Sequence, residues 1–283
     1  MVAISFIDWA LLYLHRKPQV ISIEDTIKKI IDERCSVSRY GDGELEIMMG
    51  KNLDFQTYND RLALRLKKIL HIDKLQFIVC LPDVFSTLDK YCTEGRDYWK
   101  KNLKERRRHW YELINMEKVY YNSFISRLYW IFDSKDHSSE MFMMLKFIWN
   151  ERDMVIIEGA KSRLGVRNDL FNNARSIKRI LCPAENAYSK YNLIIKEACK
   201  VEKGSLLLIA LGPTATVMAF DLHELGYQAI DIGHLDIEYE WFLARTNTRI
   251  PISGKYTNET LNGRDVGELT DAEYQKQVIA EIK

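Results

Sequence analysis

Short apolar runs alternate with longer amphipathic stretches along most of this chain. In the second half, apolar runs occupy residues 153–159, 176–183, 205–211 and 227–233, and the stretches between most of them have helical spacing. Continuous apolar strands that alternate with helices are typical of a parallel sheet with both faces covered. The pattern therefore predicts an α/β fold built on a mainly parallel sheet with helices on both faces.

The first half follows the same alternation with longer helices. Apolar runs predict strands at residues 35–40, 75–82 and 118–126, and a helix starts near Glu44. Ser22 is the predicted N-cap of the first helix. The predicted helices include residues 22–34, 59–70, 95–115, 138–150 and 185–200, and a helix after the Gly-Pro-Thr turn that Gly226 closes.

Length, charge and cysteine content narrow the class of protein. The 283 residues predict a single domain, with a helical extension at 1–21 and a mainly helical insertion at 84–150. Lys and Arg total 41 against 40 for Asp and Glu, which argues against a nucleic-acid partner bound through a strongly basic field. The five cysteines are odd in number and lack CxxC spacing, so we predict reduced thiols in a cytoplasmic protein.

Two segments leave contact with a membrane open as an alternative. Residues 1–15 are apolar but too short to span a bilayer, so they form either a helix docked on the core or an interfacial helix with Trp9 and Tyr13 at the headgroups. The basic run at 100–108 is either a solvated helix face or a contact with anionic lipid. Peripheral attachment at the inner face of the membrane is thus the alternative to a purely cytoplasmic location.

Ligands of parallel sheets bind beyond the carboxyl ends of the strands, and the loops predicted there are polar. After the first strand, Asp42 lies between Gly41 and Gly43, and Glu44 follows directly. The two carboxylates therefore have D-x-E spacing. Hard cations such as Mg²⁺ or Mn²⁺ take carboxylate oxygens together with substrate phosphates. The alternative is a turn aspartate followed by a glutamate that caps the next helix.

A second acidic group follows the last apolar strand. If residues 235–243 are helical, His234 and Glu238 share one helix face, and Asp236 and Glu240 share another. Such a group can bind a metal or act as an acid–base pair. The alternative is a solvated acidic face, although the neighbouring Ile and Trp residues indicate partial burial.

The loops after the apolar runs at 118–126, 153–159 and 205–211 carry cationic side chains, hydroxyls or the start of a helix. These groups suit an anionic ligand. The alternative for each is a local ion pair or a simple N-cap. The chain has neither the Walker spacing nor a GxGxxG fingerprint. The residues predicted to contact this ligand are Arg39, Gly41, Ser126, Arg127, Glu158, Ser162, Arg163, Asn168, Asp169, Gly212 and Thr214.

Five collinear motifs resemble the GT-D type glycosyltransferase family, a bacterial family first catalogued as a domain of unknown function. They are SRYGDGE (38–44), NSFISRLY (122–129), IIEGAKSRLGVRNDLF (156–171), ALGPTATVMAFDL (210–222) and AIDIGHLDIEYEWFL (229–243). The resemblance covers about residues 22–260 and implies a Rossmann-like GT-D fold, a Mn²⁺ or Mg²⁺ ion and a UDP-sugar donor. The chain departs from the family pattern at Leu128, where Pro is expected, and at Arg167, where Gly is expected.

The resemblance also implies a functional DxE motif, and two sites fit it. We assign Asp42 and Glu44 to the metal. The second site, Asp236 and Glu238, remains the alternative, with Glu240 or Glu238 as the candidate base. The predicted catalytic residues are Asp236, Glu238, Glu240 and His234.

The resemblance thus implies transfer of a sugar from a UDP-sugar to a glycan, glycoprotein or lipid-linked acceptor, in cell-surface polysaccharide or adhesin glycosylation. No nucleic-acid partner is expected, and a homodimer stays open. Two alternative functions remain: a non-catalytic scaffold in polysaccharide assembly, and a metal-dependent phosphoesterase that would also use clustered carboxylates.

Overall fold

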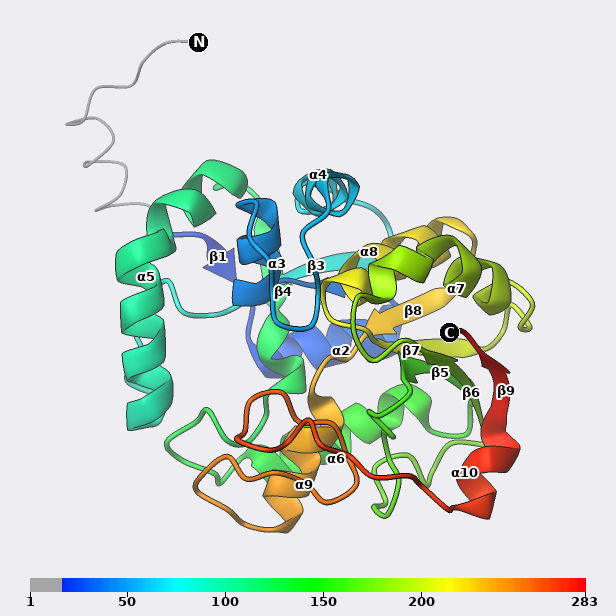
Figure 1. Ribbon diagram of the computed structural model, residues 1–283. Helices are drawn as coiled ribbons and strands as arrows, with labels where there is room; N and C mark the ends of the chain where they lie inside the picture. The colour runs from blue at the N-terminus through cyan, green and yellow to red at the C-terminus, as the bar shows by residue number, and fades with distance from the viewer. Residues whose placement is uncertain (1–16) are drawn as a thin grey trace, which may run out of the picture.

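One sheet of nine parallel strands organises the part of the chain that the computed structural model describes, residues 17–283 (Figure 1). The strand order is β1-β4-β3-β2-β8-β7-β5-β6-β9. The strands are β1 (Gln19–Val20), β2 (Ser36–Arg39), β3 (Phe77–Leu81), β4 (Val119–Asn122), β5 (Asp153–Gly159), β6 (Ser176–Cys182), β7 (Leu206–Ala210), β8 (Gln228–Asp231) and β9 (Val278–Glu281). The predicted α/β fold with a parallel sheet is therefore confirmed.

Helices pack in two groups. Helices α3, α4 and α8 contact one another, and α2 contacts α6. Since crossovers between parallel strands are right-handed, connections that run in opposite directions along the sheet lie on opposite faces. The helices are α2 (Ile23–Glu33), α3 (Asp42–Met48), α4 (Asp60–Ile69), α5 (Thr93–Leu113), α6 (Ser138–Trp149), α7 (Tyr191–Ala198), α8 (Pro213–Glu224), α9 (Leu235–Leu243) and α10 (Ala272–Gln277), with short 3₁₀ turns η1 (Ser123–Ser126) and η2 (Ala187–Lys190).

Local sequence signals set many of these boundaries. The Ser22 side chain accepts a hydrogen bond from Asp25 N at 3.0 Å, as expected for the N-cap of α2. Asn59 caps α4 in the same way. Strand β3 is buried at every position, which explains its uninterrupted apolar run.

The predicted organisation of the chain differs from the structure at the end of the N-terminal extension. Most of the predicted helical extension at 1–21 lies outside the described residues, and at its end Gln19–Val20 is a strand that pairs with β4. The segment 84–150, predicted to be a mainly helical insertion, contains α5 and α6, and the strand predicted at 118–126 is present inside it as β4, which pairs with β3. Strand β9 also escaped prediction, since its alternating burial gives no continuous apolar run.

The cysteines and the length of the helices can be compared with the predictions. All five cysteines are unpaired, and Cys35, Cys80 and Cys182 are buried, as predicted. Between residues 17 and 283, no helix is both long enough and apolar enough to cross a bilayer. The main apolar core is continuous and includes Trp110 and Trp149.

Candidate functional site

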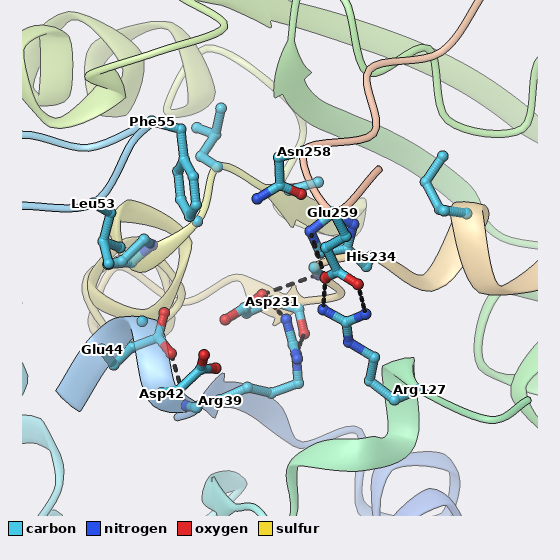
Figure 2. A pocket seen from close by; sticks show the side chains of 18 of the residues that line it. Arg39, Asp42, Glu44, Leu53, Phe55, Arg127, Asp231, His234, Asn258 and Glu259 are labelled. Carbon is cyan, nitrogen blue, oxygen red and sulfur yellow. Dashed lines mark hydrogen bonds and ion pairs between the residues drawn. The ribbon is translucent and has the colours of Figure 1, made fainter. Parts of the chain in front are cut away.

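A cavity of about 690 Å³ opens at the carboxyl ends of β2, β7 and β8, near the middle of the sheet (Figure 2). The chain turns there directly from strand into loop or helix, so Gly41, Leu211 and Gly233 all line the cavity. This is where parallel sheets bind ligands. The sheet thus brings together loops that are far apart in the sequence.

Two carboxylates from the first turn of α3 lie at one side of the cavity. Helix α3 begins at Asp42, so Asp42 and Glu44 both project near its N-terminus. The Glu44 carboxylate accepts a hydrogen bond from Gly41 N at 2.7 Å, and Asp42 accepts one from the Tyr98 hydroxyl. Burial, and then the charge of Asp231, raise the pKa of Glu44 to about 7.

An ion pair between β2 and β8 forms the floor of the cavity. Arg39 Nη2 donates to Asp231 Oδ1 at 2.7 Å, and Arg39 Nη1 donates to the Ser126 hydroxyl at 2.7 Å. Gly233 has a φ of +43°, and a Cβ there would lie 2.0 Å from Arg39 Nη2. The arginine can therefore reach across the strand ends only because residue 233 is glycine.

Glu259 is the centre of a charged cluster that faces the cavity (Figure 2). Its carboxylate accepts two hydrogen bonds from Arg127, one of them at 2.9 Å from Nη1, and lies 3.6 Å from His234 Nε2 and 3.7 Å from Arg249 Nη1. Burial raises the pKa of Glu259, but Arg127 and the neighbouring groups outweigh it and hold the pKa well below its usual range. This carboxylate is therefore ionised and fixed.

His234 is the N-cap residue of α9 and keeps a neutral imidazole at the cavity. Burial lowers its pKa to about 4; Glu259 opposes this shift, while Arg127 and Arg39 add to it. The ring is thus uncharged at neutral pH and can accept a proton.

The free energy of unfolding should report this partly buried, neutral histidine. Because the pKa falls from 6.5 to about 4 on folding, the unfolded chain binds the proton more tightly, and the native state loses stability as pH drops through that window. Between pH 7 and 4.5 we expect the wild type to lose about 1–3 kcal/mol of its free energy of unfolding through His234, and His234→Gln to lack this loss. Urea unfolding at the two pH values measures the difference. The exposed His137→Gln is the control. The same pH dependence in all three proteins would contradict the assignment.

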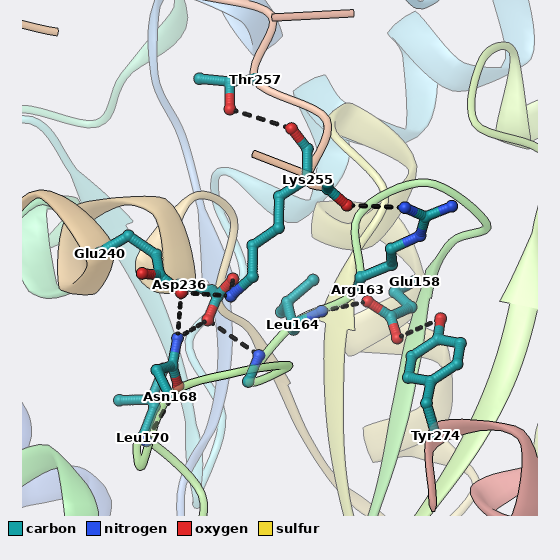
Figure 3. Close-up of polar contacts among 12 residues, drawn as sticks. Glu158, Arg163, Leu164, Asn168, Leu170, Asp236, Glu240, Lys255, Thr257 and Tyr274 are labelled. Carbon is teal, nitrogen blue, oxygen red and sulfur yellow. Dashed lines mark hydrogen bonds and ion pairs between the residues drawn. The ribbon is translucent and has the colours of Figure 1, made fainter. Parts of the chain in front are cut away.

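The second DxE motif does not form a pair of carboxylates directed at one point. Asp236 and Glu240 share a helix face, as predicted, but both are paired with Lys255 Nζ, at 2.7 and 2.6 Å (Figure 3). The Asn168 side-chain amide donates to the same two carboxylates, at 2.8 and 2.7 Å. Their charges are thus already compensated inside the protein.

Glu238 points in another direction and is fully buried. Its Oε2 accepts hydrogen bonds from Tyr129 N at 3.1 Å and Trp130 N at 2.9 Å, and Oε1 lies 3.6 Å from Arg127. Neither Glu238 nor Glu240 lines the cavity. That one of them is the catalytic base stays a prediction; in this structure both carboxylates contact the loops around the site.

Several residues predicted to bind the ligand make contacts within the protein, and their role toward a ligand stays a prediction. Glu158 is fully buried and pairs with Arg179 at 2.6 Å. Arg163 donates to two backbone carbonyls, at 2.8 and 2.6 Å, and so holds the C-terminal loop (Figure 3). Asp169 pairs with Lys146, and the buried Thr214 hydroxyl donates to Gln56.

The backbone at residue 167 explains why glycine is expected at the position that Arg167 occupies in this chain. Arg167 has a φ of +63°, in the left-handed region that favours the glycine expected there. Its side chain is exposed and does not line the cavity, so it adds no cation to the site. Leu128 is buried in the core.

The predicted residues that do line the cavity are Arg39, Gly41, Asp42, Glu44, Arg127, Ser162, Gly212, His234 and Asp236. Those that do not are Ser126, Glu158, Arg163, Asn168, Asp169, Thr214, Glu238 and Glu240. Sequence reasoning missed a third set of lining residues, Phe55, Tyr98, Trp130, Arg249, Asn258 and Glu259. Most of these come from α5 or from irregular segments without a periodic pattern, so no sequence signal placed them at the cavity.

Comparison with known proteins identifies the family. A family model described as "Glycosyltransferase GT-D fold" matches residues 37–260. The chain belongs to this glycosyltransferase family. The GT-D resemblance of the five motifs is thereby confirmed.

Solved GT-D structures agree closely with the whole fold. The chain is similar to a structure described as "A New Glycosyltransferase (DUF1792) from Streptococcus sanguinis", with a TM-score of 0.90, 36% identity, and coverage of 94% of this chain and 100% of that one. A second, described as having "a distinct glycosyltransferase fold", has a TM-score of 0.92 and 38% identity, covering 97% and 99%.

Two curated relatives of the GT-D chain are longer. It is 37% identical over 268 residues to "Probable glycosyl transferase Gly" of Streptococcus gordonii, and 37% identical over 265 residues to "Glycosyltransferase GlyD" of Streptococcus pneumoniae serotype 4. The alignments cover 94% and 93% of this chain. The chain spans only 39% and 32% of the length of those proteins.

Proposed function

We propose that this chain transfers a sugar from a UDP-sugar to an acceptor hydroxyl with the help of Mn²⁺ or Mg²⁺. The observation that carries the proposal is the cavity itself, which collects Asp42, Glu44, Arg39 and Arg127 at the carboxyl edge of a GT-D sheet. Paired carboxylates suit a hard cation, and arginines suit a diphosphate. Both groups are needed by an enzyme that cleaves a sugar–diphosphate bond.

The chemistry of the donor set fits a metal that shares its coordination with substrate. Asp42 and Glu44 offer only oxygen atoms, as Mn²⁺ and Mg²⁺ prefer. Within residues 17–283, no cluster of three or more His, Cys, Asp or Glu side chains could hold an ion. An ion on two carboxylates would take its remaining ligands from diphosphate and water. When bound, it would offset the charge that develops on the leaving diphosphate.

The contacts of the second DxE motif favour the first as the metal site. Asp236 is neutralised by Lys255, and Glu238 is held by two backbone N–H groups outside the cavity. Recruiting Asp236 would take a carboxylate from the buried Lys255, which is costly, and Glu238 lies outside the cavity, although its Oε1 has no hydrogen-bond partner in the described chain. Asp42 and Glu44 accept hydrogen bonds from the Tyr98 hydroxyl and from Gly41 N, but both line the cavity and neither is paired with a cation of the described chain.

The diphosphate would lie between Arg127 and the start of α8. Gly212 and Pro213, at the N-terminus of this twelve-residue helix, line the cavity. A helix N-terminus favours an anion because its dipole is positive. In α8 the dipole would act rather than a row of free N–H groups, because Pro213 has no N–H and Ala215 N donates to Gly212 O. The Phe55 ring packs against Gly212, where a Cβ would lie 2.6 Å from it, and supplies an apolar surface for the nucleoside.

His234 is our candidate for the proton acceptor. Among the four residues predicted to be catalytic, only His234 and Asp236 line the cavity, and Asp236 is paired with Lys255. The neutral imidazole has a free lone pair at neutral pH, with Glu259 beside its Nε2. A glycan, glycoprotein or lipid-linked acceptor would present its hydroxyl there.

The direct test is incubation of the full chain with radiolabelled UDP-sugars, Mn²⁺ and candidate acceptors. Transfer of label to an acceptor, or metal-dependent release of free sugar, is the expected result. Hydrolysis of a phosphodiester without a sugar donor would instead favour a phosphoesterase. If the chain neither turns over nor binds any common UDP-sugar, that result would favour a non-catalytic scaffold.

Arg127→Lys should weaken the enzyme's use of its donor. Lysine keeps the charge but cannot form the two hydrogen bonds with which Arg127 holds Glu259 at the cavity, so we expect kcat/KM for the donor to fall about 10–100-fold. Arg175→Lys, on an exposed arginine at the start of β6, is the matched control. Equal kinetics for both variants and the wild type would show that Arg127 does not contact the diphosphate.

A further inference from the structure

A second cavity lies at the other edge of the sheet, where the strands have their amino ends. Its volume is about 370 Å³, and we call it the basic pocket because Arg34, Arg152 and Arg175 line it. Each of these arginines comes one or two residues before a strand, β2, β5 or β6. Strand β5 has seven residues, so about 20 Å separate the two edges of the sheet. No described residue lines both the basic pocket and the first cavity.

Strand starts and two helices enclose the basic pocket. Helices α2 and α6 contact each other and contribute apolar side chains to its wall, among them Ile31 and Phe147. Phe147 is 64% exposed, so this rim of the pocket is open to solvent. A volume of this size is typical of sites for small molecules. The pocket therefore fits a small ligand rather than a segment of another protein.

The basic pocket holds more positive than negative charge. Arg175 pairs with Asp153 at 3.1 Å, which leaves two arginines in the lining. In the described part of the chain, neither Arg34 nor Arg152 forms an ion pair. The other carboxylate of the lining, Glu151, is exposed and likewise has no cationic partner among the described residues. Two guanidinium groups of the pocket are thus not compensated by a carboxylate of the protein.

Neutral partners hold the guanidinium of Arg152. Its Nη1 donates to Gln228 Oε1 at 2.7 Å and to Ile148 O at 3.2 Å, and no described residue accepts a hydrogen bond from its Nε or Nη2. Burial, and then the charge of Arg34, lower the pKa of Arg152. The second cause means that the two cations repel each other. An anion bound between them would turn this repulsion into two attractions.

A phosphoryl group is the anion that suits these two arginines best. A guanidinium group binds phosphate oxygens through parallel N–H bonds, and a phosphate dianion can compensate two such groups. A single carboxylate would compensate only one. The apolar side chains of Ile31 and Phe147 add a surface for the organic part of a phosphate ester, whereas free phosphate would use the arginines alone.

We propose that the basic pocket binds a phosphoryl group between Arg34 and Arg152, as free phosphate or as the phosphate of a small ester. This goes beyond the glycosyl-transfer proposal and does not depend on it, because the pocket lies at the opposite edge of the sheet. Loss of one charge-assisted contact should weaken binding about tenfold.

The first test is isothermal titration of the full chain at low salt with inorganic phosphate and with phenyl phosphate. We expect binding, and Arg34→Gln should weaken it about tenfold. The matched control is Arg61→Gln, at an exposed arginine in the first turn of α4 that forms no ion pair with the described residues. Its affinity should equal that of the wild type. Tighter binding of phenyl phosphate than of phosphate would assign an ester, and equal or weaker binding would assign free phosphate.

The second test locates the anion in the unaltered protein. Phenylglyoxal modifies arginine side chains, and mass spectrometry of the digested protein gives the rate of modification at each position. Bound phosphate should slow the modification of Arg34 and Arg152 and leave that of Arg61 unchanged.

Three results would overturn the proposal. The first is no binding of either phosphate compound. The second is an equal loss of affinity in Arg34→Gln and Arg61→Gln. The third is protection of Arg39 and Arg127 without protection of Arg34, which would place the anion in the first cavity only. None of these measurements requires glycosyl transfer, so failure of this proposal is distinguishable from failure of the proposed function.

Discussion

Asp42→Asn is expected to lower the rate of glycosyl transfer about 10²–10³-fold, the loss typical when one preorganised electrostatic group is removed. Asparagine has the same shape and can still accept the hydrogen bond from Tyr98, so the fold should be retained. What is lost is the negative oxygen that would bind the metal beside Glu44. The activity should therefore need a higher Mn²⁺ concentration, measured by titrating the metal in the transfer assay.

The control for this prediction is Asp169→Asn. Asp169 was predicted to contact the ligand, but it lies outside the cavity and pairs with Lys146. Its substitution should leave kcat and the Mn²⁺ requirement nearly unchanged. If Asp42→Asn retained full activity at low Mn²⁺, or if Asp169→Asn lost as much, the metal would not lie at the first DxE motif.

Lys255→Met is expected to lower the free energy of unfolding by about 3–5 kcal/mol, the usual cost of removing one partner from a buried ion pair. The Lys255 and Asp236 side chains are each 3% exposed, and Glu240 is 18% exposed. The variant would leave two carboxylates buried in one place with only Asn168 to donate to both. Urea unfolding followed by circular dichroism measures the change.

The matched control is Lys276→Met, which removes an ion pair between side chains that are 70% and 78% exposed. A pair of this kind contributes about 0–1 kcal/mol. Lys255 also fixes the loop that carries Glu259, so its loss should reduce transfer as well as stability. A Lys255→Met protein as stable as the control would mean that Asp236 and Glu240 are compensated in another way.

Much of the fold follows from local chemistry. Ser22 marks the start of α2, the uninterrupted apolar run of β3 marks a strand buried on both faces, and Gly226 ends α8 with a positive φ. Such signals depend only on neighbours within a turn or two. Edge strands β1 and β9 gave no such signal, since a strand of two residues and a half-exposed strand are recognised only by what they pair with.

The sequence also identified the edge of the sheet where the site lies and half of its polar residues. Asp42, Glu44 and Arg39 were found because loops at the carboxyl ends of parallel strands share one rim. The spacing of Asp236 and Glu240 showed that they share a helix face, and the structure agrees. The spacing could not say what would cover that face.

By itself, then, the sequence determined the parallel α/β fold, the GT-D family and the rim that carries the chemistry. Only the tertiary structure decided which carboxylates stay free, because that depends on partners distant in the sequence. Lys255 neutralises Asp236, and Glu259 reaches Arg127 across 132 positions of the chain. Burial and long-range pairing set the charge of each group, and neither is encoded in local spacing.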